Sequence, residues 1–213
     1  MSTTTPSWVM TYDSLTTMVL QYLERSDPAV VEAIPTFITL CEFEIAQEIK
    51  TLGQLTVANF TLTQANPIVA KPARWRKTVS MTAKVDDVAQ PIYVRKLEYL
   101  RNYWPDETQT DVPKYYADTD YEHWYFAPTP SEAFEVQVLY YERISPLSSS
   151  NQTNWLTQNA PNAMLYGTLL QAMPFLKNDS RAIFQQKYTE AINALKTEDA
   201  LRIADRQAVA MDS

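Results

Sequence analysis

The chain has 213 residues, of which 46% are hydrophobic and 12% aromatic, so it can bury a sizeable core and is not a disordered chain. It holds only 2 glycines, 1 histidine and 1 cysteine, which excludes a glycine-rich phosphate-binding loop, a zinc site built on histidine and cysteine, and a disulfide within the chain. The net charge of −7 argues against a protein that holds nucleic acid by its phosphates.

Two amphipathic helices are predicted at the N-terminal end. The first spans residues 13–24, with Asp13 as its cap and apolar residues spaced three and four apart along one face. The second spans residues 28–50 and follows the cap residue Asp27, and Pro35 is expected to kink or restart it. Its buried face is expected to comprise Ile34, Phe37, Ile38, Cys41, Ile45, Ile49 and Leu52.

The periodicity then changes to the alternation that is typical of β-strands. The segments are separated by Pro, Asn and Asp rather than by Gly. A short helix is expected at residues 97–104, ended by Pro105. The predicted strands span residues 54–63, 75–82, 91–96, 115–118, 123–127 and 134–142.

Helical periodicity returns near the C-terminal end. Residues 159–161, Asn-Ala-Pro, form a helix start signal, and the apolar stripe that follows ends at Pro174. Asp179 is expected to cap a last long helix, on whose apolar stripe Phe184 and Tyr188 lie.

A tail of mixed polarity follows this helix. It is expected to begin at residue 201 and contains apolar residues in a region that should otherwise be hydrated. These residues are Leu201, Ile203, Val209 and Met211. The tail is interpreted either as a disordered end or as a segment that docks into a pocket of a partner.

Together the elements predict an α+β fold. The N- and C-terminal helix pairs form one helical bundle, and an antiparallel β domain is inserted between them. The expected parts are residues 1–53 for the N-terminal helices, 54–145 for the β domain, 146–200 for the C-terminal helices and 201–213 for the tail.

Charge is distributed unevenly along the chain. Residues 1–70 carry 2 basic and 7 acidic groups, residues 71–104 carry 8 basic and 3 acidic groups, and residues 105–213 carry 8 basic and 15 acidic groups. The basic middle segment is interpreted either as internal neutralisation on a solvated face or as a patch that docks an acidic neighbour, such as another copy of this chain.

Residues that could carry catalysis do not form a marked set. The only histidine, His123, is flanked by acidic residues, yet a strand at 123–127 would point His123 and Glu122 to opposite faces, so a surface or packing role is expected. Cys41 lies on an apolar helical stripe and is expected to be an inert core residue. No pair among the 25 acidic residues is distinguished as the pair of a glycosidase. We expect no cofactor and no metal.

Twelve aromatic residues crowd between positions 99 and 141. Three interpretations stay open: the core of a small β domain, a protein interface, and a stacking surface for sugars or single-stranded nucleic acid.

Several segments, taken in order, resemble the head–tail adaptor (connector) proteins of tailed bacteriophages. TYDSLTTMVLQYLERSDP and AIPTFITLCEFEIAQEI resemble the opening helix pair of that family. DVPKYYADTD, WYFAPTP and VLYYERISPLS resemble its β domain, and TNWLTQNAPNAMLYGTLLQA resembles the start of its closing helices. The likeness covers most of residues 11–197, and the segment after residue 201 matches no motif of the family.

The resemblance implies a structural protein of the virion, made in the host cytoplasm and placed at the head–tail interface, with no catalytic set. Because the chain has no run of about 18 apolar residues, no membrane-spanning segment is expected either. Such adaptors form a twelve-subunit ring under the capsid portal, dock the tail nozzle or tail fibres, and let double-stranded DNA pass through the lumen without specific binding. By this resemblance the portal contact is expected at Phe184, Tyr188, Leu201, Ile203, Val209 and Met211. The tail-side or subunit contact is expected at Tyr99, Tyr103, Trp104, Tyr121, Trp124 and Tyr141.

Two alternative functions, from other classes of protein, stay open. One is a virion-associated glycan hydrolase built on an unmarked pair of carboxylates. The other is a sugar-binding β module, which would use the aromatic residues for stacking.

Overall fold

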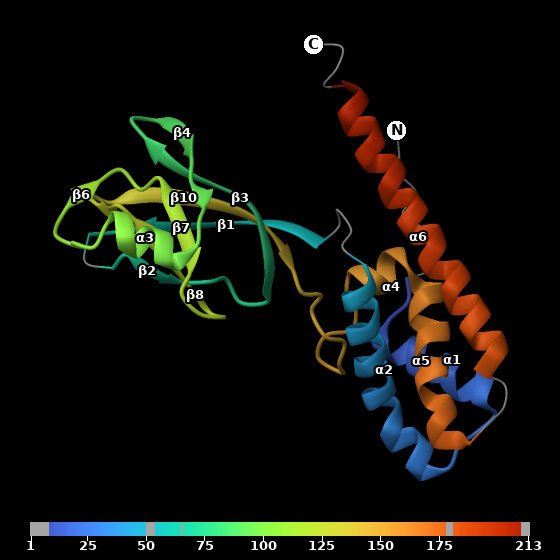
Figure 1. Cartoon of the computed structure of the whole chain (residues 1–213). Helices are drawn as coiled ribbons and strands as arrows, with labels where there is room; N and C mark the ends of the chain where they lie inside the picture. The colour runs from blue at the N-terminus through green and yellow to red at the C-terminus, as the bar shows by residue number, and fades with distance from the viewer. Residues whose placement is uncertain (1–8, 50–53, 65, 178–180, 210–213) are drawn as a thin grey trace. The chain divides into compact units, whose positions relative to one another are not determined.

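The computed structural model describes residues 9–49, 54–64, 66–177 and 181–209, and the side chains of the last segment as far as Arg202. Its helices and predominantly antiparallel sheets give the mixed α+β class that the sequence predicts. The chain divides into two compact units (Figure 1). The helical unit joins Met1–Gln54 to Ile144–Ser213, and the β unit is Leu55–Arg143.

The helical unit has five described helices that share one core. They are α1 (Tyr12–Leu23), α2 (Pro28–Glu48), α4 (Trp155–Asn159), α5 (Pro161–Leu176) and α6 (Arg181–Val209). Helix α5 contacts all four others, so it is the central element of this unit. Its sequence fits that position, because nine of its residues are buried, among them Met164, Leu169 and Met173.

The helix starts depend on local capping, and the predicted cap residue of the first helix is wrong. Thr11, not Asp13, caps α1: its side chain accepts from the Ser14 N–H at 3.1 Å, and Ser14 Oγ accepts from the Thr11 N–H at 2.8 Å. Asp27 does precede α2, with Pro28 in the first turn, but its side chain makes no cap hydrogen bond. Pro35 does not end α2, which continues as one helix to Glu48.

The stripe predicted along α2 is buried at each described position: Ile34, Phe37, Ile38, Cys41, Ile45 and Ile49. Leu52 lies outside the described residues. Gly167 of α5 allows α2 and α6 to approach closely. A Cβ atom at this position would lie 2.4 Å from Cys41 Sγ and 3.1 Å from the Tyr188 ring.

Helix α6 is longer than the sequence predicts. It continues to Val209, so residues 201–209 extend the helix rather than form a separate tail. Leu195 is the last described residue of α6 that packs in the core. Figure 1 shows α6 running beside α5 and projecting beyond it. The 14 residues after Leu195 correspond to about 21 Å of helix. The expected cap residue, Asp179, lies outside the described residues.

Strands of the β unit form two four-stranded sheets, here called sheet 1 and sheet 2, and a two-stranded ladder. Sheet 1 has the order β1 (Leu55–Leu62), β10 (Phe134–Glu142), β3 (Trp75–Val85), β4 (Val88–Pro91). Sheet 2 has the order β2 (Ile68–Ala70), β8 (His123–Ala127), β7 (Tyr115–Asp118), β5 (Tyr93–Val94). The ladder joins β6 (Thr110–Asp111) to β9 (Thr129–Pro130).

Both short pairs, β5 with β7 and β6 with β9, are parallel, so the β unit is not antiparallel throughout as predicted. The predicted strand at 91–96 is also divided, because β4 ends at Pro91 and β5 begins at Tyr93.

The two four-stranded sheets pack face to face. Met81, Val136 and Val138 of sheet 1 share a buried cluster with Trp124 and Phe126 of sheet 2. Helix α3 (Leu97–Tyr103) covers the opposite face of sheet 2 through Leu100, which packs on Ala117, Tyr125 and Ala127. Both faces of β8 are therefore covered, whereas the outer face of sheet 1 remains exposed.

Candidate interaction surfaces

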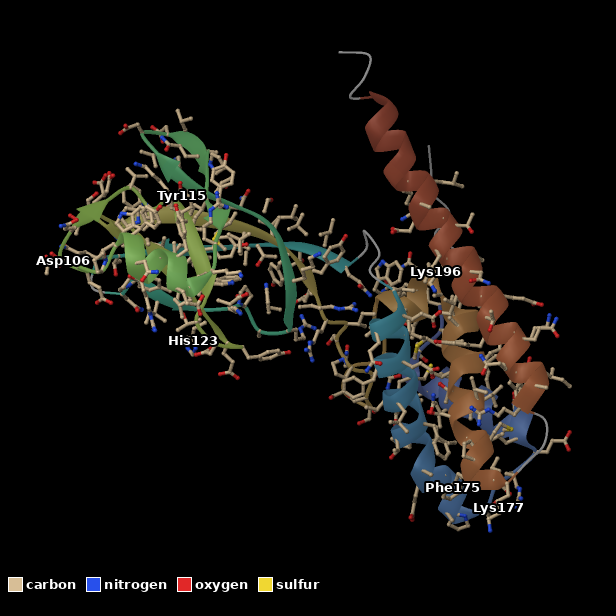
Figure 2. All side chains as sticks on the ribbon, in the orientation of Figure 1. Asp106, Tyr115, His123, Phe175, Lys177 and Lys196 are labelled. Carbon is tan, nitrogen blue, oxygen red and sulfur yellow. The ribbon has the colours of Figure 1, made fainter. Side chains whose placement is uncertain are left out.

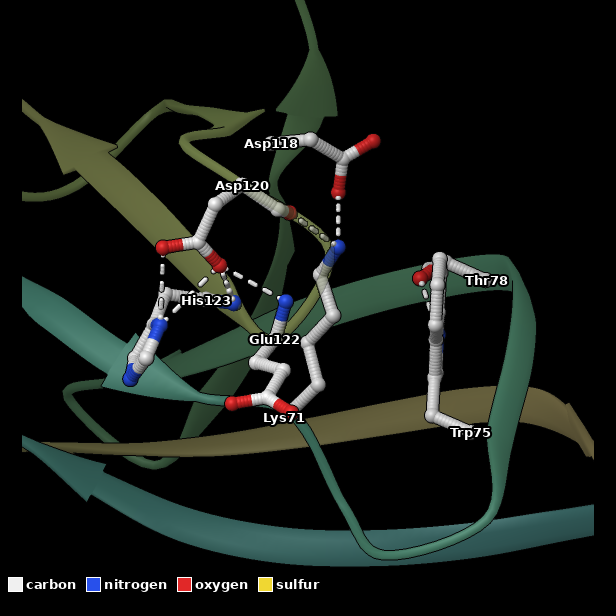
Figure 3. A network of polar contacts seen from close by, with 7 residues as sticks. All are labelled: Lys71, Trp75, Thr78, Asp118, Asp120, Glu122 and His123. Atoms are coloured by element: carbon white, nitrogen blue, oxygen red, sulfur yellow. Dashed lines mark hydrogen bonds and ion pairs between the residues drawn. The ribbon is translucent and has the colours of Figure 1, made fainter.

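His123 belongs to a local turn rather than to a cluster of chemical groups. Asp120 Oδ1 accepts the backbone N–H groups of Glu122 at 2.7 Å and His123 at 2.8 Å, and both carboxylate oxygens lie 3.0 Å from His123 Nδ1 (Figure 3). The Glu122 hydrogen bond is the main cause that lowers the pKa of Asp120. Among the described residues, no three His, Cys, Asp or Glu side chains gather as metal ligands.

Lys71 lies at the centre of a polar network between two strands of sheet 2 and the start of β3 (Figure 3). Its Nζ lies 2.7 Å from Asp118 Oδ1, donates to the Asp120 carbonyl at 3.0 Å, and sits 4.1 Å from the centre of the Trp75 ring. The Trp75 indole N–H in turn donates to Thr78 Oγ1 at 3.1 Å. Only 4% of the Lys71 side chain is exposed, so its charge stabilises the β unit internally.

Other members of the basic segment are also paired within the β unit. Arg74 forms an ion pair with Glu142 at 2.8 Å, and Lys84 forms one with Asp87 at 2.7 Å. These contacts support internal neutralisation for this part of the segment. Lys77 differs, because it is exposed on the outer face of sheet 1 opposite Tyr141.

The aromatic residues expected at a tail-side contact are not all accessible. Trp124 is wholly buried between the sheets, so as an interface residue it is a wrong choice and belongs to the core. Tyr99 and Trp104 are half-buried in the cluster that α3 forms with Tyr115, which is among the residues labelled in Figure 2.

Three candidates of that set reach the surface of the β unit. Tyr103 and Tyr121 are each 66% exposed, and Tyr121 accepts a hydrogen bond from Arg143. Tyr141 is half-buried on the outer face of sheet 1.

The residues expected at a portal contact also differ in how far their side chains are accessible. Tyr188 is 3% exposed and packs in the helical core, where its hydroxyl donates to Glu48 Oε2 at 3.3 Å. Burial, and then the Glu44 carboxylate, raise the pKa of Tyr188 well above its usual range. Phe184 is half-buried against the same core, so part of its side chain remains accessible.

Leu201, in contrast, is 62% exposed on the projecting part of α6. Ile203 and Val209 belong to α6, but their side chains lie outside the described ones, and Met211 lies outside the described residues altogether.

Two exposed apolar faces were not identified from the sequence. On α2, Leu40 and Phe43 are 46% and 56% exposed on the side opposite the core. On the outer face of sheet 1, Val57 and Val79 are 54% and 49% exposed. The sequence did hold a signal for the first face, because α2 carries no lysine or arginine and its outer side includes the large apolar residues Leu40 and Phe43.

The described surface of the β unit also has two hollows. One, of about 490 Å³, lies on the outer face of sheet 1, and its lining combines polar residues such as Asn59 and Gln137 with the apolar Phe60 and Val136. The second, of about 310 Å³, is lined by two aromatic residues, Trp75 and Tyr121, together with charged residues such as Arg74 and Arg143.

A sequence model of the SU10 adaptor protein family matches residues 10–210. The chain belongs to this family. The resemblance to phage head–tail adaptors is therefore confirmed, since the SU10 adaptor family is a family of such proteins. A comparison with curated proteins finds no match.

Membership of the SU10 adaptor family indicates a structural role in the phage particle, at the junction of head and tail, in contact with portal and tail components. No helix among the described residues has the length and apolar character needed to span a membrane.

Proposed function

We propose that this SU10 adaptor family protein is a non-enzymatic head–tail connector. Twelve copies form a ring that joins the capsid portal to the tail and encloses the channel for the DNA. The helical elements of each copy act as one bundle that supports the portal contact, and the inserted β domain faces the tail or the neighbouring subunit. Family membership supports the structural role.

The observation that carries the portal assignment is the projecting part of α6. Leu195 is the last described core residue, and the helix continues to Val209 with Leu201 exposed. A helix end that is not used by its own core is suited to docking in a groove of a partner, because an exposed apolar residue there gains stability when it is covered.

The charge of the protein supports the channel. A net charge of −7 disfavours adhesion of the DNA duplex to the wall, because like charges repel. The genome could then pass without specific binding.

The experiment is a truncation after Lys196. The shortened protein keeps all described core residues and the ion pair of Lys196 with Glu48 at 2.8 Å. We therefore expect the free energy of unfolding to change by about 1 kcal/mol or less, while binding to the portal protein, measured by sedimentation of the mixture, is lost.

A second truncation, after Val209, serves as the control because it keeps the whole of α6 and removes Met211 among the expected contact residues. It should bind the portal protein nearly as the full chain does, because the proposed contact is the helix itself. Normal portal binding by the variant cut after Lys196 would exclude the end of α6 as the contact.

A further inference from the structure

Helix α2 presents an uncovered face on the side opposite the core. The positions there are three and four residues apart, so they form one continuous stripe. They are Ala29, Glu32, Thr36, Leu40, Phe43 and Gln47. Glu32 is the only charged member, and the stripe is about 27 Å long, at 1.5 Å per residue.

The stripe carries one charged residue among six, whereas a surface helix normally carries several charged residues opposite its core face. Phe43 is nonetheless 56% exposed and Leu40 46% exposed within the described helical unit. Their exposure indicates a face that a further surface covers.

The outer face of sheet 1 offers a matching surface. The register places Val57 opposite Leu139, and Leu55 opposite Tyr141. The β-bulge in β3 leaves Val79 without a partner beside Ser80, so that it adds to the same face. Val57 and Val79 are about half exposed, and the others are half-buried.

Charge distinguishes the two faces and decides how they can pair. The α2 stripe carries one charge, the Glu32 carboxylate, and no basic residue, whereas Lys77 is exposed beside the apolar patch of sheet 1. Two α2 stripes packed on each other would place two Glu32 carboxylates in one interface, and two sheet faces would place two Lys77 ammonium groups in one interface. A contact between the two different faces avoids both repulsions.

We infer that the outer α2 stripe of one copy packs on the outer face of sheet 1 of a second copy, with Phe43 against the patch of Val57 and Val79. Such a contact joins two different patches, so it is heterologous and can be repeated from copy to copy until a ring closes. The inference rests on the proposed ring, and it assigns the faces that form its subunit contact.

Cross-linking between single-cysteine additions tests this pairing. The wild-type chain has one cysteine, Cys41, which is buried. Phe43→Cys protein and Val57→Cys protein are purified separately, mixed with the portal protein, and treated with a short bis-maleimide. We expect a dimer joined through positions 43 and 57, identified by peptide mass spectrometry.

Phe175→Cys mixed with Val57→Cys is the matched control. Phe175 lies on α5 and is 51% exposed, close to the value for Phe43, but it is not part of the stripe. The yield of cross-linked dimer with Phe43→Cys should exceed the yield in that control by roughly tenfold or more. The reason is that two faces in stable contact raise the effective concentration of one thiol near the other.

Portal attachment, followed in the same mixtures by sedimentation, separates this inference from the proposed function. If the copies attach to the portal but the yield only equals the control, the α2–sheet contact is wrong and the connector role stands. Cross-links of position 43 to itself or to the portal would equally overturn the contact. If no copy of the wild-type protein attaches, the proposed function itself fails.

Discussion

At the scale of single residues, Gly167 controls how closely three helices pack. A methyl group there would meet Cys41 Sγ at 2.4 Å and the Tyr188 ring at 3.1 Å. Gly167→Ala should therefore lower the free energy of unfolding by about 1–3 kcal/mol through overpacking, despite the better helix propensity of alanine. Urea denaturation measures this change.

Cys41→Ala, combined with Gly167→Ala, supplies the control, because it removes the sulfur that the new methyl group meets. The double variant should recover part of the loss. An equal loss with and without Cys41→Ala would show that this contact is not the cause.

Lys71 offers a second prediction at this scale. Lys71→Met keeps most of the stem over the Trp75 ring and removes the charge, and Asp118, whose side chain is 57% exposed, stays hydrated. The variant should lose about 1 kcal/mol of stability, whereas Lys71→Ala, which also removes the stem, should lose about 2 kcal/mol or more. Thermal unfolding followed by tryptophan fluorescence compares them, and equal losses would contradict the role given to the stem.

At the scale of elements, Glu42 fastens α2 to the segment before α4. The Glu42 carboxylate accepts the Leu147 N–H at 3.1 Å and the Asn154 side-chain N–H at 2.7 Å. Burial raises its pKa from 4.5 to about 7, although both hydrogen bonds act in the opposite direction.

This raised pKa predicts a pH dependence. The folded protein holds the Glu42 proton more tightly than the unfolded chain, so the stability gained is fully present below about pH 4.5 and is lost as the pH rises through about 7. Its full extent is about 3 kcal/mol. Glu42→Gln, which can still accept both hydrogen bonds, should remove this part of the slope between pH 5 and 8 in urea denaturation. Identical slopes for the two proteins would refute the assignment.

The elements could largely be predicted from the sequence where their periodicity is long. The apolar stripe of α2 and the alternation of β10 are examples, and β7 and β8 begin and end where predicted. β2, β6 and β9 were missed because two or three residues are too few to establish a period.

The burial of single aromatic residues could not be predicted in the same way. β8 is covered by sheet 1 on one face and by α3 on the other, so four of its five residues are buried and the alternation disappears. Periodicity alone therefore does not show that Trp124 is buried, and the crowding of aromatic residues around it equally favours an interface. Tyr188 was misassigned because periodicity gives the face of a helix but not the neighbour that covers it.

At the scale of the whole molecule, the chain combines a helical unit, whose last helix projects beyond the core, with a β unit that has one exposed sheet face. Each unit therefore has its own core and retains surfaces that its own core does not use. This arrangement suits a protein whose stability is separate from its contacts with partners, as expected of an adaptor of the SU10 family.

Electron microscopy of this protein mixed with the portal protein of the same phage, with each protein alone as a control, tests the central claim most directly. The connector function predicts an additional ring of twelve copies on the portal, with α6 at the contact. Portal rings that remain bare, while this protein stays separate in the same mixture, would contradict it.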